Sequence, residues 1–436
     1  IKLYRNVRLF FIKISPFFLP IFDPMKHLVI IGQIFPEPDS TAAGKRMLQL
    51  IDFFIRYEFR ITFLSAANSS QHSFDLSSKN IETHIIQLND SSFDHLVKKL
   101  QPDFVLFDRF MTEEQFGWRV SEMCTGVIKI LDTEDLHFLR KAREKAFNQN
   151  RKIENADLIS DVFKREIASI LRCDLSLIIS EYEMNLLKEK FKVDESILHY
   201  LPIFVEPNYS SNTFSERKNF ISIGNFLHEP NWQTVLQLKK IWPLIRKQIP
   251  EAEIHLYGAY PSDKAFQLHH PKEGFHIKGR AENLAETLKK YRIMLAPIPF
   301  GAGIKGKLLD AMQFGLPSVT SSIGAEGMNG NLKWSGFIAD SEEDFIEKSV
   351  QLYQDESSWK KAQGNGYRIL TERFSKVHFE DSFISKLKEV AANIDEHRNK
   401  NFLGQILQHH QLKSTKYMSR WIEEKNHRVN RTNSTD

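Results

Sequence analysis

The stretch PFGAGIKGKLLDAMQFGLPSVTSSIGAEG, residues 299–327, decides the fold of this chain. It begins with a glycine-rich loop whose backbone can approach a ligand closely. The spacing of leucine and methionine then predicts a short helix over residues 305–314. Gly315 ends that helix, Pro317 prevents its continuation, and a strand is predicted at residues 318–321. This order of loop, helix and strand is typical of a parallel α/β sheet.

Two lysines stand at the start of the predicted helix. Lys305 and Lys307 meet the positive end of the helix dipole, which disfavours a cation by roughly 0.3–1 kcal/mol unless an anion is bound. A diphosphate would reverse that cost. Asp310, one turn further, could accept hydrogen bonds from sugar or ribose hydroxyls. The alternative is a solvated pair of Lys307 with Asp310, worth about 0.3 kcal/mol. The glycine-rich loop and the position of the lysines favour the phosphate-binding interpretation.

Outward from this stretch, β-rich runs alternate with amphipathic helical runs, which predicts two doubly wound units. Strands of the first unit are predicted at residues 28–32, 60–65, 83–88, 104–107, 127–131, 175–180 and 197–202. One long helical stretch is predicted at residues 136–171. Strands of the second unit are predicted at residues 220–223, 253–257, 275–278, 293–296 and 318–321. Ligands of such sheets bind beyond the carboxyl ends of the strands, so the chemistry is expected between the two units.

Changes in composition along the sequence mark the boundaries of further segments. Residues 1–24 are apolar and basic but interrupted by charges and prolines, so we interpret them as an upstream or leader segment. The first domain is predicted at residues 25–205 and the second at 220–375, with a linker at 206–219. The remainder is predicted to form C-terminal helices at 376–425 and a disordered tail at 426–436.

Composition excludes several classes of protein. The chain has 436 residues, too many for one hydrophobic core, and 42% of them are hydrophobic, as in ordinary globular proteins. A net charge of +4 is too small to predict nucleic acid as the main ligand. Cys124 and Cys173 form no metal-ligand spacing, which favours a reducing, cytoplasmic setting. A nicotinamide dehydrogenase is disfavoured, because no GxGxxG follows a predicted strand.

The motifs DAMQFGLPSV and GAEG closely resemble the donor-binding segment of the family 4 (group 1) glycosyltransferases. Further matches are IGQIFPEPDSTAAGKRM, CDLSLIISEYEMNLL, YLPIFVE and FISIGNFLHEPNWQTV. The resemblance implies the GT-B fold, two Rossmann-like domains facing a central cleft. It also implies transfer of a sugar from a nucleotide diphosphate with retention of configuration, and neither a metal nor a cofactor.

The resemblance and the residue pattern together give the predicted site. Lys305, Asp310 and His137 are expected to be catalytic. The expected donor-binding residues are Gly303, Lys305, Lys307, Asp310, Glu326 and Arg280. Arg109, Asp135 and His137 follow predicted strands of the first unit and are expected on the acceptor side. For His137 a second interpretation stays open, a helix residue satisfied by polar neighbours; for Arg109 and Arg280 the alternative is an exposed arginine.

Two departures from the family pattern bear on activity. The first member of the family's acidic pair falls on Ala302, and the second is Asp310 in place of glutamate. The family's phosphate-gripping Arg and Lys are replaced by the loop 224–228, which reads GNFLH. Phosphate binding is therefore expected to rest more heavily on Lys305 and Lys307.

Three functions are compatible with this pattern. The first is a glycosyltransferase that uses a nucleotide-sugar donor and a glycan, lipid-linked or small-molecule acceptor. The second is an inactive GT-B protein that only binds nucleotide sugars, which Ala302 motivates. The third is a sugar-nucleotide epimerase. Residues 402–426 carry apolar side chains among basic ones. We expect them to pack against the protein itself; the alternative is that they lie on the inner face of a membrane.

Overall fold

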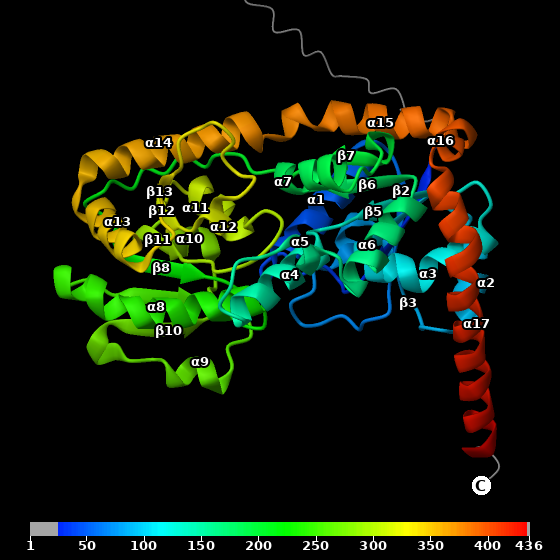
Figure 1. Cartoon of the computed structure of the whole chain (residues 1–436), viewed down its shortest axis with the longest axis horizontal. Helices are drawn as coiled ribbons and strands as arrows, with labels where there is room; N and C mark the ends of the chain where they lie inside the picture. Colours follow the sequence, from blue (N-terminus) through cyan, green and yellow to red (C-terminus); the bar gives the residue numbers. More distant parts are fainter. Residues whose placement is uncertain (1–24, 434–436) are drawn as a thin grey trace, which may run out of the picture.

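The computed structural model describes residues 25–433 and shows two Rossmann-like domains side by side (Figure 1). The predicted leader segment 1–24 lies outside the described residues. Each domain is built on one sheet whose paired strands all run parallel. The predicted α/β, GT-B architecture is confirmed.

The first domain holds a seven-stranded sheet in the order β3-β2-β1-β4-β5-β6-β7. Its strands are β1 His27–Gly32, β2 Arg60–Ser65, β3 Glu82–Ile85, β4 Phe104–Asp108, β5 Ile128–Asp132, β6 Leu175–Ile178 and β7 Leu198–Tyr200. Its helices are α1 Ala42–Arg56, α2 Ser92–Leu100, α3 Arg109–Met123, α4 His137–Asn148, α5 Asn155–Leu158, α6 Asp161–Arg172 and α7 Glu181–Asn185. Strands β1, β4, β5 and β6 are buried along their whole length, as expected for a sheet covered on both faces.

The second domain holds a six-stranded sheet in the order β10-β9-β8-β11-β12-β13. Its strands are β8 Lys218–Ile223, β9 Ile254–Tyr257, β10 Phe275–Gly279, β11 Tyr291–Ala296, β12 Ser318–Thr320 and β13 Gly336–Ile338. Its helices are α8 Glu229–Gln248, α9 Asp263–Gln267, α10 Leu284–Leu288, α11 Gly306–Gln313, α12 Ser322–Ala325, α13 Glu342–Gln354 and α14 Glu356–Arg373. The order places α11 directly after the loop that follows β11, where the lysines were expected.

The last helices return to the first domain. They are α15 Glu380–Ala392, α16 Ile394–Lys400 and α17 Phe402–Asn433. Figure 1 shows α14 and α15 running along one side of both domains, with α17 beside α2 and α3. Phe383 of α15 is fully buried and its ring lies 4.7 Å from that of Phe53. The C-terminal helices therefore complete the core of the first domain and tie the two domains together.

Three sequence predictions about these elements were wrong. The long helix at 136–171 is three helices, because the chain turns at Asn150, whose φ is +51°, and again before α6. Strand β13 was missed, since three residues are too short to show a pattern. The tail predicted to be disordered is helical to Asn433, since no glycine or proline ends α17 after Gly404.

The apolar side chains of α17 do not pack as expected. The helix meets the first domain through polar groups: Ser419 is buried against Arg119, and the carboxylate of Glu423 accepts the N–H of Ser91 at 2.8 Å. Among the described side chains of α17, the large apolar ones that stay at least 50% exposed are Phe402, Leu403, Ile406, Tyr417, Met418 and Trp421. The reason is that the surface beneath α17 carries charges, so ion pairs and hydrogen bonds make the contact. Contact of this face with a membrane stays a prediction.

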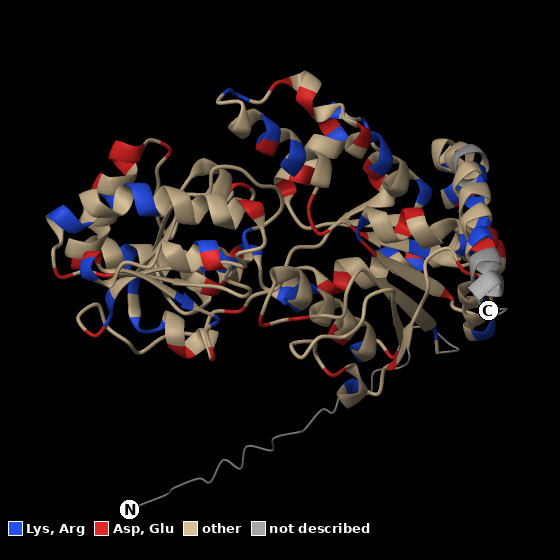
Figure 2. Ribbon diagram, turned by 90° about the horizontal axis from the view of Figure 1, so that it is seen from below, with Lys and Arg blue, Asp and Glu red and all other residues tan. Residues whose placement is uncertain are grey.

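None of the helices in the described part of the chain combines the length and the apolarity that crossing a membrane requires. Figure 2 shows acidic and basic residues interspersed over both domains. This mixture agrees with the small net charge of the sequence.

Candidate active site

A cavity of about 730 Å³ lies between the two domains. The first domain contributes the loop after β1 and the residues after β4 and β5; the second contributes the loops after β8, β9, β10 and β11. These are the carboxyl ends of the strands, where parallel sheets bind ligands. The walls approach closely at Gly306, where a Cβ would lie 2.7 Å from that of Ala42. The second domain's glycine-rich loop thus faces the start of α1 across the cavity.

Lys305 lines this cavity and is 8% exposed. Its amino group donates a hydrogen bond to the carbonyl of Gly303 at 2.9 Å. Burial lowers the pKa of Lys305 to about 8, against the opposite pull of Glu326. A buried amino group with a lowered pKa gains most from an incoming anion, because that anion restores the charge that burial disfavours.

Lys307, in the first turn of α11, also lines the cavity. Its amino group donates to the side-chain oxygen of Asn231 at 2.7 Å, at the start of α8. Burial lowers the pKa of Lys307 to about 7. The amino group also approaches Gly224, since a Cβ there would lie 2.9 Å from it. Both lysines and the amino ends of α8 and α11 thus lie in the wall of the cavity.

Asp310 lines the cavity but does not pair with Lys307, the partner that a solvated helical pair would have given it. Its carboxylate accepts a hydrogen bond from Lys45 of α1 at 2.7 Å, across the domain boundary. The sequence offered no signal for this pair, whose members are 265 residues apart. A cation of the other domain therefore holds Asp310, one turn into α11, on the cavity wall.

Gly303 is fixed by a buried carboxylate of the first domain that sequence reasoning missed. Glu183 accepts the N–H of Gly303 at 2.8 Å and the N–H of Leu136 at 3.0 Å. Gly303 has φ of +62°, and a Cβ there would lie 2.8 Å from that of Asp135, so only glycine fits this crossing. Ala302 lines the cavity without a polar group. Glu183 therefore joins the glycine-rich loop to the loop after β5.

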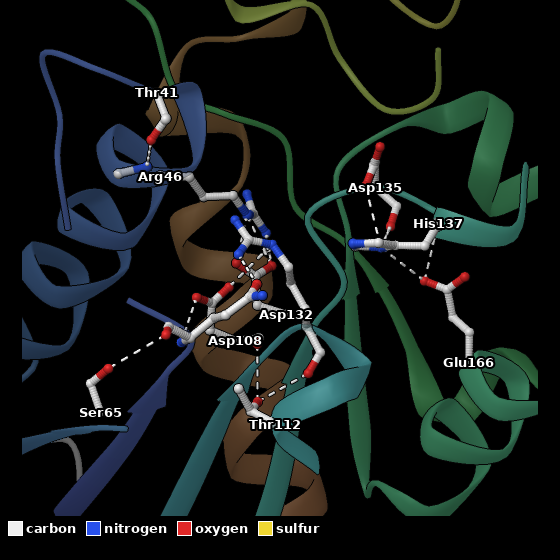
Figure 3. A network of polar contacts seen from close by, with 12 residues as sticks. Thr41, Arg46, Ser65, Asp108, Thr112, Asp132, Asp135, His137 and Glu166 are labelled. Carbon is white, nitrogen blue, oxygen red and sulfur yellow. Dashed lines mark hydrogen bonds and ion pairs between the residues drawn. The ribbon is translucent and has the colours of Figure 1, made fainter. Parts of the chain in front are cut away.

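His137 and Asp135 lie together on the first-domain wall. The Nδ1 of His137 lies 3.2 Å from the carbonyl of Asp135 and 3.4 Å from a carboxylate oxygen of Glu166 (Figure 3). Glu166 also accepts the N–H of His137 at 3.0 Å, which anchors the first residue of α4. Burial disfavours the charged Asp135, but Arg140 and His137 hold the pKa of its carboxyl below the usual value. The imidazole is oriented by its neighbours while its ring faces the cavity.

Arg109 is the first residue of α3 and also lines the cavity. Its guanidinium donates to the side chain of Gln33, and its φ is +69°. The neighbouring Asp108 accepts the N–H of Gln33 at 3.0 Å. Beneath it, Asp132 and Arg46 form a fully buried ion pair at 2.7 Å (Figure 3). This network fixes the ends of β4 and β5 and places Arg109 as a wall residue, not an exposed arginine.

Residues 217–355 match the family Glycosyl transferases group 1. The second domain is therefore similar to that of the group 1 glycosyltransferases over most of its length. The match covers the loop after β8, the glycine-rich loop and α11, and so includes both lysines and Asp310.

Comparison with solved structures shows the same fold for most of the chain. An uncharacterized 44.6 kDa protein in cps region of Klebsiella pneumoniae is 28% identical over 177 residues, 38% of this chain. The match spans only 45% of that relative. Sucrose-phosphate synthase of Thermosynechococcus elongatus superposes with a TM-score of 0.64 at 12% identity, over 84% of this chain and 100% of that one. Anabaena HepE, in complex with UDP and glucose, gives 0.62 at 12%, over 84% and 100%. At such identities the likeness to solved structures shows the fold alone.

A further acidic residue of the cavity wall was not predicted. Glu134 lines the cavity with a φ of +62°, and its Oε1 atom has no hydrogen-bond partner among the described residues. Burial and the charge of Asp132 raise the pKa of Glu134 to about 8. Its signal was weak, since one acidic residue in LDTEDLHFLR cannot be told from its neighbours by sequence alone. The first domain thus supplies acidic side chains to a cavity in which position 302 is alanine.

The side chains of Arg280 and Glu326, both expected to bind the donor, contact residues of the protein itself in this structure. Arg280 lines the cavity, but its guanidinium donates to the hydroxyl of Ser40 at 3.0 Å and lies over the ring of Tyr260. Glu326 is not among the residues that line the cavity; its carboxylate accepts two hydrogen bonds from Arg143, both at 2.8 Å. Both residues form contacts between the two domains. Their contact with a donor stays a prediction.

Proposed function

We propose that this chain is a retaining glycosyltransferase that moves a sugar from a nucleotide diphosphate to a glycan acceptor, without a catalytic metal. The observation that carries the proposal is the pair of partly neutralised lysines, Lys305 and Lys307, at the start of α11 inside the interdomain cavity. Their position suits a diphosphate, whose charge grows as it leaves the sugar. The group 1 match and the relative from a cps region support a role in polysaccharide biosynthesis.

In this proposal the two domains divide the work. The lysines and α11 hold the diphosphate, while Asp310 accepts hydrogen bonds from donor hydroxyls at the same helix. His137 and Asp135 face the cavity from the first domain and orient the acceptor hydroxyl. Glu134 supplies an acidic group near the position where Ala302 supplies none. We propose a uridine diphosphate donor, since HepE was solved with UDP and glucose.

Nucleotide binding gives the first test. We expect UDP at a hundredfold excess over its Kd to stabilise the chain by about 2.7 kcal/mol, measured by differential scanning. Guanosine and adenosine diphosphates serve as the comparison that assigns the base. If none of the three shifts the melting of the folded protein, the proposed donor site is wrong.

Asp310→Asn separates a donor contact from a purely structural one. The change keeps the shape of the side chain but removes a charged acceptor, and a charge-assisted hydrogen bond is worth about 1.5–3 kcal/mol. We expect donor affinity or turnover to fall by about ten- to a hundredfold, with little change in melting temperature. Kinetics of donor consumption provide the measurement.

Lys45→Met is the matched variant for that experiment, because it breaks the same 2.7 Å pair from the other side. If Asp310 only closes the domains through this pair, the two variants should lose equal activity. A greater loss in Asp310→Asn supports donor contact.

A binding protein without turnover is the second candidate, and Ala302 is the observation that favours it. Slow donor hydrolysis or transfer that depends on Lys305 would exclude it. An epimerase would convert the donor with no acceptor present, so product analysis separates that activity from transfer.

A further inference from the structure

Glu253, His255 and His276 form a cluster on the sheet of the second domain, away from the cavity. Residues 253 and 255 point to the same side because side chains alternate along a strand. Ile254 and Leu256 point to the other side and belong to the hydrophobic core. The register pairs His276 of β10 directly with His255 of β9. The topology therefore brings two imidazoles and one carboxylate together on one face.

The atoms that could bind an ion lie close together. The Nε2 of His255 is 2.9 Å from one carboxylate oxygen of Glu253, and the Nε2 of His276 is 3.6 Å from the other. All three candidate ligand atoms lie within 4.8 Å of one another. The Nε2 of His276 is buried and has no hydrogen-bond partner among the described residues. An ion between the rings would satisfy this nitrogen.

The hydroxyl of Tyr291 contacts the imidazole of His255. The Nδ1 of His255 lies 2.5 Å from the hydroxyl of Tyr291, which lies 3.2 Å from that of Tyr257. A tyrosine hydroxyl both donates and accepts, so it can accept the Nδ1 proton and leave Nε2 free to bind an ion. Imidazoles that bind metals almost always donate their other N–H in this way.

We propose that Glu253, His255 and His276 bind a divalent transition-metal ion, and that this ion is zinc. Two imidazole nitrogens with one carboxylate oxygen are a ligand set that zinc accepts, with a fourth position left to water. The carboxylate side is open to solvent, since the side chain of Glu253 is 42% exposed and each histidine 13%.

His269 is the next nearest imidazole, but it is not a ligand in this arrangement. Its ring lies 5.6 Å from that of His276, and its Nδ1 accepts the N–H of Ile277 at 3.1 Å. The proton of a neutral ring is then on Nε2, so neither nitrogen is free. The ion therefore has three protein ligands.

The site has a structural role, because none of its three ligands lines the cavity. Zinc would join β10, the edge strand, to β9. Strand β10 ends at Gly279, and Arg280 follows directly in the cavity wall. Metal binding would thus fix the base of the loop that carries Arg280. This inference does not depend on the proposed transferase activity.

Zinc titration of the full chain, freed of metal by a chelator, tests the proposal. Calorimetry should show one site, and zinc should raise the melting temperature of the unmodified protein. His276→Gln should abolish both effects. Tyr291→Phe keeps the ligands but removes the supporting hydroxyl, so zinc affinity should fall about ten- to a hundredfold. Absence of a binding isotherm for the unmodified protein would overturn the proposal.

His84→Gln is the matched control. The Nε2 of His84 lies 2.9 Å from the carboxylate of Glu82 on β3, a pair with the same i,i+2 spacing that belongs to no three-ligand group in the described chain. This variant should bind zinc like the unmodified protein. Equal zinc affinity in His276→Gln and His84→Gln would contradict the assignment.

A spectroscopic measurement on the unmodified protein tests the proposal even if a ligand variant fails to fold. Cobalt bound in place of zinc should give the visible absorption of a four-coordinate ion in the unmodified protein, and Glu253→Gln should lose it. UDP binding is measured separately, in the unmodified protein. Its absence there would count against the donor site and not against the metal site.

Discussion

Replacement of Lys305 by alanine should lower turnover by about 10²- to 10³-fold, the usual loss when one preorganised group that stabilises transition-state charge is removed. Lys305 is 8% exposed, and its amino group is held at the carbonyl of Gly303 beside the start of α11. In the proposed reaction the departing diphosphate gains negative charge at this position. Donor hydrolysis can be followed in place of transfer, so the measurement does not require the acceptor.

The control for this variant is Lys348→Ala on α13, a lysine of the same domain that does not line the cavity. It should leave turnover unchanged. Loss of donor binding with unchanged kcat in Lys305→Ala would assign the residue to ground-state binding only. Turnover equal to that of the unmodified protein would exclude the proposed role of Lys305.

The affinity for a nucleotide sugar should fall by about a hundredfold between about pH 6.5 and 8.5. In the free protein burial lowers the pKa of Lys307 to about 7 and that of Lys305 to about 8. A bound diphosphate raises both pKa values, so the complex keeps both protons. Below pH 7 the free protein already carries them, and affinity is flat. Above about pH 7 binding must take up a proton on Lys307, and above about pH 8 a second proton on Lys305.

The other titratable groups considered either weaken diphosphate binding as the pH rises or keep the same charge over this range. Burial raises the pKa of Glu134 and of Glu183 to about 8, so both gain negative charge over this range and repel the diphosphate. Burial and the nearby Arg140 lower the pKa of His228 to about 4, so it stays neutral throughout. The sign of the expected change is therefore the same for every titrating group considered.

Calorimetry in buffers of different ionisation enthalpy measures the proton uptake directly. A nucleotide sugar is the right probe, because its diphosphate does not titrate in this range, and the matching nucleoside is the control without phosphate. Lys307→Met should remove about one proton from the uptake. An affinity that stays constant, or rises with pH, would show that the lysines do not face the diphosphate.

The sequence predicted the position of Lys305 and Lys307 at a helix start correctly, because local signals determine it. The run from Gly301 to Pro317 encodes loop, helix and stop in consecutive residues, so Lys305 and Lys307 fall at the start of α11 as expected. Strand boundaries such as Arg60–Ser65 follow from apolar runs between polar turns. Signals of this kind depend on neighbours along the chain.

Contacts between distant segments left no such trace. Glu183 reaches Gly303, Lys45 reaches Asp310 and Arg143 reaches Glu326 only after the two domains meet. Each of these charged residues resembles an ordinary surface residue in the sequence. The exposed apolar face of α17 was misjudged for the same reason, since the polarity of the surface beneath it depends on α3 and on the loop before α2.

The sequence by itself determined two parallel α/β domains, their order, and a phosphate-binding pattern at the start of one helix, because periodicity, glycines and caps act within a few residues. Only the tertiary structure decided which carboxylates face the cavity, which cation holds Asp310 and how far burial lowers the pKa of each lysine. Burial and long-range pairing are properties of the packed chain, and a residue's charge and reactivity in the cavity follow from them.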